Sequence, residues 1–147
     1  SKHADIIVMA AAVADFRPMK NEKLKIKKES GYKVIELAPT KDILSELGKR
    51  KNGSILVGFA LETENELANA KKKLRNKNLD LIVLNSLNDE KSGFGYDTNK
   101  ITIIHPSPSL PKGERDSMKV VAKKFILMGK TEFAKIIVKE IIQHIQK

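Results

Sequence analysis

Residues 4–13 read ADIIVMAAAV, an apolar run in which β-branched side chains come first and small ones last. A run of this kind, apolar on both sides of the chain, predicts a strand buried on both faces, as in a parallel sheet. Ser54 to Ala60 (SILVGFA) and Asp80 to Asn85 (DLIVLN) have the same character. Lys100 to His105 alternates and predicts a fourth strand, and Lys33 to Leu37 predicts a short edge strand.

Helical patterns alternate with these strands. Thr40 is predicted to cap a first helix, and Thr63 with Glu66 has the spacing of a capping box for a second. Thr131 is predicted to cap a closing helix. The side chains expected to face inward are Ile43, Leu44 and Leu47 in the first helix, Leu67, Ala70 and Leu74 in the second, and Phe133, Ile137, Ile141 and Ile145 in the third.

Strands that alternate with helices predict the α/β class. We expect a Rossmann-like, doubly wound, mostly parallel sheet with helices on both faces, plus a short edge or flap region. The length of 147 residues fits one domain, and the absence of cysteine excludes disulfides and thiolate chemistry. No apolar run approaches the roughly 20 residues that cross a bilayer. These features predict a cytoplasmic protein that does not enter a membrane.

The net charge of +10 favours anionic partners, although a lysine-rich surface is the ordinary alternative. Six basic residues lie between Arg17 and Lys28, where Lys25 could belong to a flap that closes over phosphates or to a simple tether. Lys73 and Lys77 are four residues apart, so they share one helix face. A polyphosphate would satisfy both ammonium groups, and a solvated face is the alternative.

Two predicted strand ends carry candidate ligand contacts, because ligands of open α/β sheets bind outside the carboxyl ends of the strands. Asp15 could accept hydrogen bonds from ribose hydroxyls or could stabilise a turn. Phe59, after Gly58, could lie against a base or could be a core side chain.

Other nucleotide and metal motifs are missing. Met128 to Thr131 (MGKT) resembles the end of a P-loop, but Lys124 stands where that motif needs glycine. The sequence contains no GxGxxG fingerprint, and its three histidines lack metal-ligand spacing, so no metal-binding residue is predicted.

Several stretches together resemble, in order and spacing, the bacterial phosphopantothenoylcysteine synthetase family. They are AAVADFRP (11–18), KIKK (25–28), GFALET (58–63), KNLDLIVLN (77–85) and GFG (93–95), followed by Asp97, Asn99 and the closing helix. Such synthetases usually form the C-terminal half of a bifunctional protein. Its other half is a flavin-dependent phosphopantothenoylcysteine decarboxylase, and FMN belongs to that half only.

The resemblance implies a CTP-dependent ligase of coenzyme A biosynthesis. It would join 4'-phosphopantothenate to L-cysteine through an acyl-cytidylate, releasing pyrophosphate and then CMP, with Mg²⁺ assisting. Family members are homodimers. By the same resemblance, Met9, Ala10 and Ala11 would read the cytosine edge, Asp15 would lie near base or ribose, and Lys25 would be a catalytic flap lysine over the triphosphate. The remaining CTP contacts would be Lys41, Asp42, Ile43, Leu44, Phe59, Lys73 and Lys77.

Residues 1–147 depart from the family in three ways. The family often has Asn-Pro-Asp-Ile where this chain has Thr40 to Ile43, and the segment 106–123 is longer and more basic. The family's first strand, its phosphate loop and an asparagine that acts on the acyl intermediate would precede Ala4. We therefore expect a truncated synthetase domain that is inactive alone. A basic nucleic-acid-binding module, and a nicotinamide- or flavin-binding oxidoreductase domain, stay open as alternatives.

Overall fold

A computed structural model describes residues 4–25, 34–86, 88, 92, 95–107 and 119–146 of the chain. The chain forms two compact units. The larger unit contains residues 1–10 and 44–147, and the smaller unit contains residues 11–43.

The larger unit is built on a five-stranded mixed sheet with the order β1-β4-β5-β7-β8. Its strands β1, β4 and β5 are parallel, whereas β7 is antiparallel to β5 and β8 is antiparallel to β7. The strands are β1 (Ile6–Met9), β4 (Ile55–Glu62), β5 (Leu81–Ser86), β7 (Ile101–Pro106) and β8 (Val120–Lys124). The three strands predicted at 54–60, 80–85 and 100–105 are thus confirmed.

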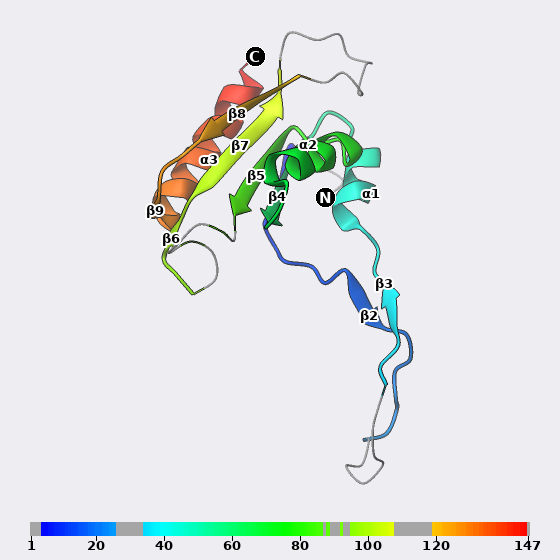
Figure 1. The fold of residues 1–147 in the computed structure, drawn as a ribbon. Coiled ribbons are helices and arrows are strands. Elements are labelled where there is room, and N and C mark those ends of the chain that lie inside the picture. Colours follow the sequence, from blue (N-terminus) through cyan, green and yellow to red (C-terminus); the bar gives the residue numbers. More distant parts are fainter. Residues whose placement is uncertain are drawn as a thin grey trace. The chain divides into compact units, whose positions relative to one another are not determined.

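Helices cover both faces of this sheet, which confirms the predicted α/β class (Figure 1). Along β4, Leu56 and Ala60 pack toward α1 (Ile43–Lys49) and α2 (Glu66–Asn76). Val57, between them, packs on the other face with Phe133 and Ile141 of α3 (Lys130–Ile145). Successive side chains of a strand point to opposite faces, so one apolar run fills two separate cores.

The register of β4 against β5 is fixed at their amino ends by Asp80. Its backbone N–H donates to the Leu56 carbonyl at 2.9 Å, and its Oδ2 accepts from the Leu56 N–H at 2.7 Å. Its Oδ1 lies 2.5 Å from the Lys51 ammonium group, in a pair whose side chains are mostly buried. This arrangement sets Val57 opposite Leu81 and carries the same register to Glu62 opposite Ser86.

The strand predicted over Ala4 to Val13 is shorter and less buried than expected. It ends at Met9, and Ile6 and Val8 are 43% and 45% exposed. The physical reason is position, because β1 pairs only with β4 among the described strands and lies at the sheet edge.

The smaller unit contains an antiparallel pair, β2 (Phe16–Pro18) and β3 (Leu37–Pro39). The edge strand predicted over 33–37 therefore lies later in the chain, and residues 26–33 are outside the described part. Pro18 is the last residue of β2, and proline is tolerated at such an end of a two-stranded ribbon. Thr40 donates its hydroxyl to the Ala14 carbonyl at 2.6 Å, so it closes the ribbon.

The predicted helix caps are wrong. The helix α1 begins at Ile43, three residues after Thr40. Asn65, with φ 47°, precedes α2, and the carboxylate of Glu66 bonds the Ser86 hydroxyl. Gly129 precedes α3 without a side-chain cap, and a two-stranded pair, β6 (Thr98–Asn99) and β9 (Met128–Gly129), leads into it.

Most of the residues predicted to face inward do so. Ala70, Leu74, Phe133 and Ile141 are buried, and Leu44, Leu47 and Ile137 pack against the two cores. The exceptions are Ile43, Leu67 and Ile145, which are 45%, 38% and 53% exposed and lie at or next to helix ends. Near the end of a helix fewer neighbouring side chains are available, so some apolar side chains predicted to face inward remain exposed to solvent.

The C-terminus of α2 is locked against α1. Asn78, with φ 53°, donates its N–H to the Arg75 carbonyl, and Leu79 donates to Leu74, which is a Schellman motif with asparagine in the left-handed position. The Asn78 amide also donates to the Gly48 carbonyl at 2.8 Å. A Cβ on Gly48 would lie 1.9 Å from the Lys77 carbonyl oxygen, so only glycine permits this approach.

Gly48→Ala should destabilise the larger unit by about 1–3 kcal/mol, because backbone must move to admit the methyl group. Gly58→Ala is the comparison, since its Cβ would meet only the ends of the Leu44 and Leu79 side chains, at 2.9 and 2.8 Å. Urea unfolding followed by circular dichroism measures both losses. A larger loss for Gly58→Ala would contradict this view of the junction.

Candidate functional site

An open cavity lined by polar residues begins where β4 ends and follows α2. Its volume is about 300 Å³. The strand β4 contributes its last residue, and α2 contributes residues from its middle to its C-cap. The lining residues are Glu62, Asn69, Lys72, Lys73, Asn76 and Lys77. Glu62 places one end of the cavity at the carboxyl-end edge of the parallel strands, where open α/β sheets bind ligands, and the rest of the cavity follows α2 toward its C-terminus.

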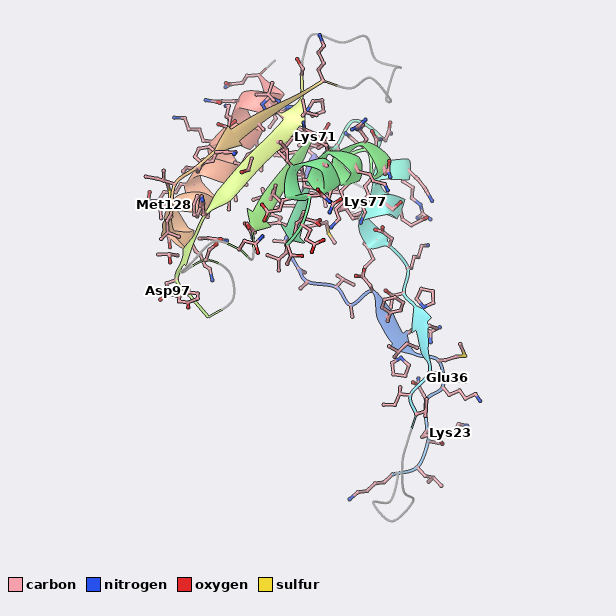
Figure 2. All side chains as sticks on the ribbon, in the orientation of Figure 1. Lys23, Glu36, Lys71, Lys77, Asp97 and Met128 are labelled. Carbon is pink, nitrogen blue, oxygen red and sulfur yellow. The ribbon has the colours of Figure 1, made fainter. Side chains whose placement is uncertain are left out.

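The two lysines that the sequence placed on one helix face do meet in this cavity. Lys73 lies in the last turn of α2. Lys77, labelled in Figure 2, is the C-cap residue of the same helix. The backbone N–H of Lys77 donates to the Lys73 carbonyl at 3.0 Å, and the Schellman motif then ends the helix. Cations are favoured at this end because the last carbonyl groups of a helix carry partial negative charge.

Glu62 brings a carboxylate into the same cavity. Its side chain is 12% exposed, and its Oε1 lies 2.6 Å from the Lys73 ammonium nitrogen as an ion pair. Oε1 is buried and makes no contact with hydrogen-bond geometry, so the ion pair is the contact that compensates it. Oε2 accepts a hydrogen bond from the Asn69 amide at 3.1 Å. Glu62 belongs to the GFALET stretch (58–63), but no local pattern in the sequence indicated a role for it.

A second polar cluster holds the loop between β4 and α2. The Glu66 carboxylate accepts from the Ser86 hydroxyl, and from the Asn88 amide at 3.2 Å. The same amide donates to the Thr63 carbonyl at 2.7 Å. Asn85, one residue before Ser86, has a buried side-chain oxygen without a hydrogen-bond partner among the described residues. The predicted capping partners Thr63 and Glu66 therefore bind the end of β5 instead of each other.

Phe59 does not share the lysine cavity. Its side chain packs with the second core, on the α3 face of β4, whereas α2 covers the opposite face. Of the two interpretations given for Phe59, a contact to a base or a core side chain, its packing in the structure is that of a core side chain.

The other predicted contacts are divided between the two units. Met9 ends β1, Ala10 follows it, and Leu44 of α1 packs against the first core of the larger unit. The remaining residues belong to the smaller unit, and all of them are exposed: Ala11, Asp15, Lys25, Lys41, Asp42 and Ile43. Their roles at a nucleotide stay predictions.

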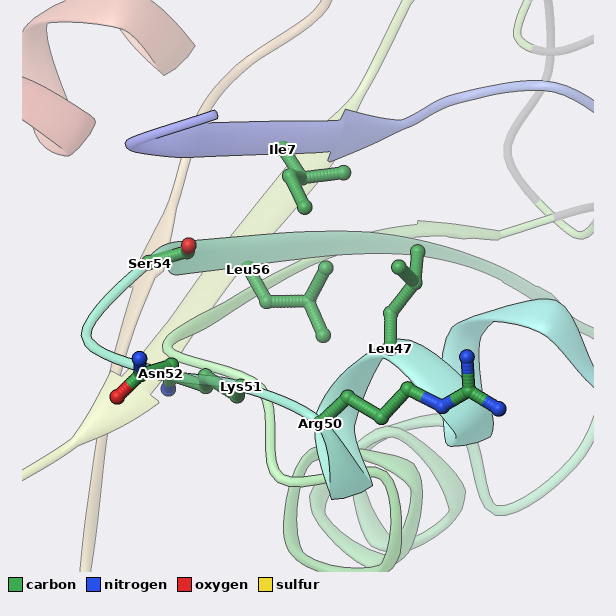
Figure 3. Close-up of a pocket in the computed structure, with 7 residues that line it drawn as sticks. All are labelled: Ile7, Leu47, Arg50, Lys51, Asn52, Ser54 and Leu56. Carbon is green, nitrogen blue, oxygen red and sulfur yellow. The ribbon is translucent and has the colours of Figure 1, made fainter. Parts of the chain in front are cut away.

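A cavity of about 320 Å³ lies near the amino end of β4. Ile7, Leu56 and Leu47 converge there from β1, β4 and α1 (Figure 3). Arg50, Lys51, Asn52 and Ser54 complete its lining. It is larger than the lysine cavity, but Lys51 is already paired with Asp80 and the position is at the wrong end of the parallel strands for a ligand of this fold. We therefore take the lysine cavity as the candidate site.

Within the described ranges, no three His, Cys, Asp or Glu side chains gather in a way that could hold a metal ion. Among the described helices, none is long and apolar enough to cross a bilayer.

Comparison with known proteins gives a family and several relatives. A family model described as the DNA/pantothenate metabolism flavoprotein C-terminal domain matches residues 1–145. The chain is 51% identical over 101 residues to the coenzyme A biosynthesis bifunctional protein CoaBC of Bacillus subtilis, which is 69% of this chain and 25% of that protein. It is 52% identical over 126 residues to a cysteine/cysteine sulfinic acid decarboxylase of an unknown prokaryotic organism, which is 85% of this chain and 35% of that protein.

The fold has a close match among solved structures. The crystal structure of the C-terminal domain of a coenzyme A biosynthesis bifunctional protein CoaBC superposes with a TM-score of 0.68 at 32% identity. The match covers 99% of this chain and 57% of that one. The chain thus spans about a third or less of the two curated relatives and somewhat over half of the solved domain.

Lys73→Ala and Lys77→Ala should each weaken the binding of inorganic tripolyphosphate by about 1.5–3 kcal/mol, the value of a lost charge-assisted hydrogen bond. Isothermal titration of the 147-residue chain measures the loss. Lys139→Ala is the matched control, because Lys139 is exposed on α3, across the sheet. Unchanged affinity in both cavity variants would mean that this lysine face is only solvated.

Proposed function

The chain belongs to the DNA/pantothenate metabolism flavoprotein C-terminal domain family, and on that premise we propose that it is the nucleotide-binding part of a phosphopantothenate–cysteine ligase in coenzyme A biosynthesis. Relatives named for coenzyme A biosynthesis at 51% identity support the pathway. The resemblance of the AAVADFRP, KIKK, GFALET and KNLDLIVLN stretches to the synthetases supports the reaction.

One structural observation supports this proposal above the others: Lys72, Lys73 and Lys77 line one cavity together with Glu62, the last residue of the parallel strand β4. The ligase reaction requires binding a triphosphate and stabilising the charge that develops on it. The phosphopantothenate carboxylate attacks the α-phosphate, and pyrophosphate leaves. The cysteine amine then attacks the acyl carbon and expels CMP. Fixed ammonium groups serve this chemistry by positioning and electrostatics, without an acid–base pair.

The proposed partners follow from the reaction and from the relatives. The substrates are CTP, 4'-phosphopantothenate and L-cysteine, and the active form is a homodimer in the cytoplasm. Mg²⁺ would arrive with the phosphates, because Mg²⁺ commonly binds through substrate phosphates. Bifunctional relatives support fusion or pairing with a decarboxylase half, which would hold the FMN.

The relative named as a cysteine/cysteine sulfinic acid decarboxylase matches over 35% of its own length. That name describes a longer protein, and we propose that decarboxylation belongs to its regions outside the matched part. Carbon dioxide release from cysteine by the 147-residue chain would favour decarboxylation over ligation for this domain.

The proposed ligase should prefer CTP to ATP. If the backbone at Met9 to Ala11 reads the base, its donors and acceptors cannot be re-aimed at a purine, so ATP should bind about 1–3 kcal/mol more weakly. Competition titrations with CTP, ATP and NAD should be made with the complete domain, with the family's upstream phosphate loop present. Equal affinity for CTP and ATP would refute the cytosine assignment, and preference for NAD would favour the oxidoreductase alternative.

Lys25→Gln should slow cytidylate formation far more than it alters stability, because Lys25 is exposed and supports no core. Pyrophosphate release by the complete domain measures the first effect, and thermal unfolding measures the second. The 147-residue chain alone should show little or no turnover. An unchanged rate in the variant would remove Lys25 from the proposed site, and turnover by the chain alone would refute the expected truncation.

A further inference from the structure

Glu62 is the residue of the lysine cavity that the proposed chemistry does not explain. A polyanion site gains from positive charge, yet a carboxylate lies inside it. The carboxylate is mostly buried, and its Oε1 faces the Lys73 ammonium group at 2.6 Å. Its other oxygen, Oε2, accepts a hydrogen bond from the Asn69 amide at 3.1 Å.

The burial of the Glu62 Oε1 determines whether Lys73 can leave its ion pair when an anion binds. The ion pair is the contact that compensates this oxygen, which is otherwise buried without a hydrogen bond. If Lys73 left Glu62 for a phosphate, it would leave an uncompensated charge that water reaches poorly, and such a charge is strongly unfavourable. Lys73 is therefore expected to remain paired with Glu62.

The ion pair with Glu62 does not prevent Lys73 from also binding an anion. An ammonium group has three N–H donors, so it can serve Glu62 and a phosphate together. The Lys73 side chain is 42% exposed, whereas that of Glu62 is 12% exposed. The open side of the ion pair is thus the lysine side, and an incoming phosphate meets the ammonium group before it meets the carboxylate.

We propose that Glu62 is a positioning residue of the phosphate site, which anchors Lys73 at the end of β4 and remains paired with it when a polyphosphate binds. This inference rests on the proposed function for the nature of the ligand. In it, Lys73 supplies a fixed donor and also masks the Glu62 carboxylate, while Lys72 and Lys77 supply net positive charge.

A double-mutant cycle tests the anchor, with inorganic tripolyphosphate titrated into the 147-residue chain. Glu62→Ala should weaken binding about tenfold, because it frees a charge-assisted donor that had been fixed in place. Glu62→Gln should stay within about threefold of the parent, since its amide oxygen still accepts from Lys73. In the Lys73→Ala background, Glu62→Ala should cause no further loss and should raise affinity, because it removes an unmasked negative charge.

Glu64→Ala is the matched control, because Glu64 is an exposed carboxylate two residues away and only its backbone carbonyl contacts Asn69. It should bind tripolyphosphate like the parent. Thermal unfolding of every variant separates a loss of binding from a loss of folding. If Glu62→Ala fails to fold, the Glu62→Gln and Lys73→Ala variants and their double variant complete a second cycle.

NMR of the lysine ammonium groups gives a readout that a purely structural role would not move. In the ligand-free parent, the Lys73 Nζ protons should exchange slowly with water, as expected for an ammonium group held by a mostly buried partner. Glu62→Ala should abolish this protection and Glu64→Ala should not. Saturation with tripolyphosphate should shift the signal and keep it protected.

Three results would overturn the proposal. Tighter binding by Glu62→Ala when Lys73 is present, that is, as a single substitution in the parent chain, would show that the carboxylate competes with phosphate. Equal losses with and without Lys73 would show a structural role only, and a parent chain that binds tripolyphosphate no better than Lys73→Ala would remove Lys73 from the site. Failure of the ligase proposal looks different: tripolyphosphate binding and the cycle would persist, while the complete domain would show no preference for CTP.

Discussion

The register between β4 and β5 is the constraint on which the larger unit depends. Asp80 sets it by exchanging hydrogen bonds with both backbone groups of Leu56, and Lys51 compensates its carboxylate. A slip of one residue would turn every side chain of β4 to the opposite face and would exchange the contents of the two cores. The same register places Glu62 opposite Ser86 at the far end of the pair, so a contact at the amino ends positions the carboxylate of the candidate site at the carboxyl end of β4.

The contacts at the two ends of α2 then determine the position of the helix that lines the candidate site. Its start is tied to the end of β5 through Glu66, Ser86 and Asn88, and its end is closed by the Schellman motif at Asn78 and by the approach of Gly48. The helix is therefore fixed at both ends relative to the sheet. Lys73 lies in its last turn and Lys77 is its C-cap residue, where the partial charge of the helix favours cations, and Glu62 of β4 pairs with Lys73. A polyanion site of this kind is compatible with the activation chemistry proposed for the family.

The sequence predicted the fold class well because the central strands are long apolar runs and the helices have clear apolar stripes. The runs at 54–60, 80–85 and 100–105 became β4, β5 and β7. Helix starts were predicted poorly, because Thr40, Thr63 and Glu66 found partners distant in sequence, such as Ala14 and Ser86, in preference to the adjacent helix N–H groups. The exposure of β1 was missed for a related reason, since apolar composition does not reveal that a strand lies at the edge of a sheet.

The sequence by itself determined that this chain is an α/β protein, that it resembles the phosphopantothenoylcysteine synthetases, and that Lys73 and Lys77 share a helix face. These conclusions rest on periodicity and on motif order, which are local properties of the chain. Only the tertiary structure decided that Phe59 packs into the α3 core, away from the lysines, and that Glu62 enters the lysine cavity. Both depend on which face of β4 is covered by which helix. That is fixed by strand pairing between residues far apart in sequence, and no local pattern encodes it.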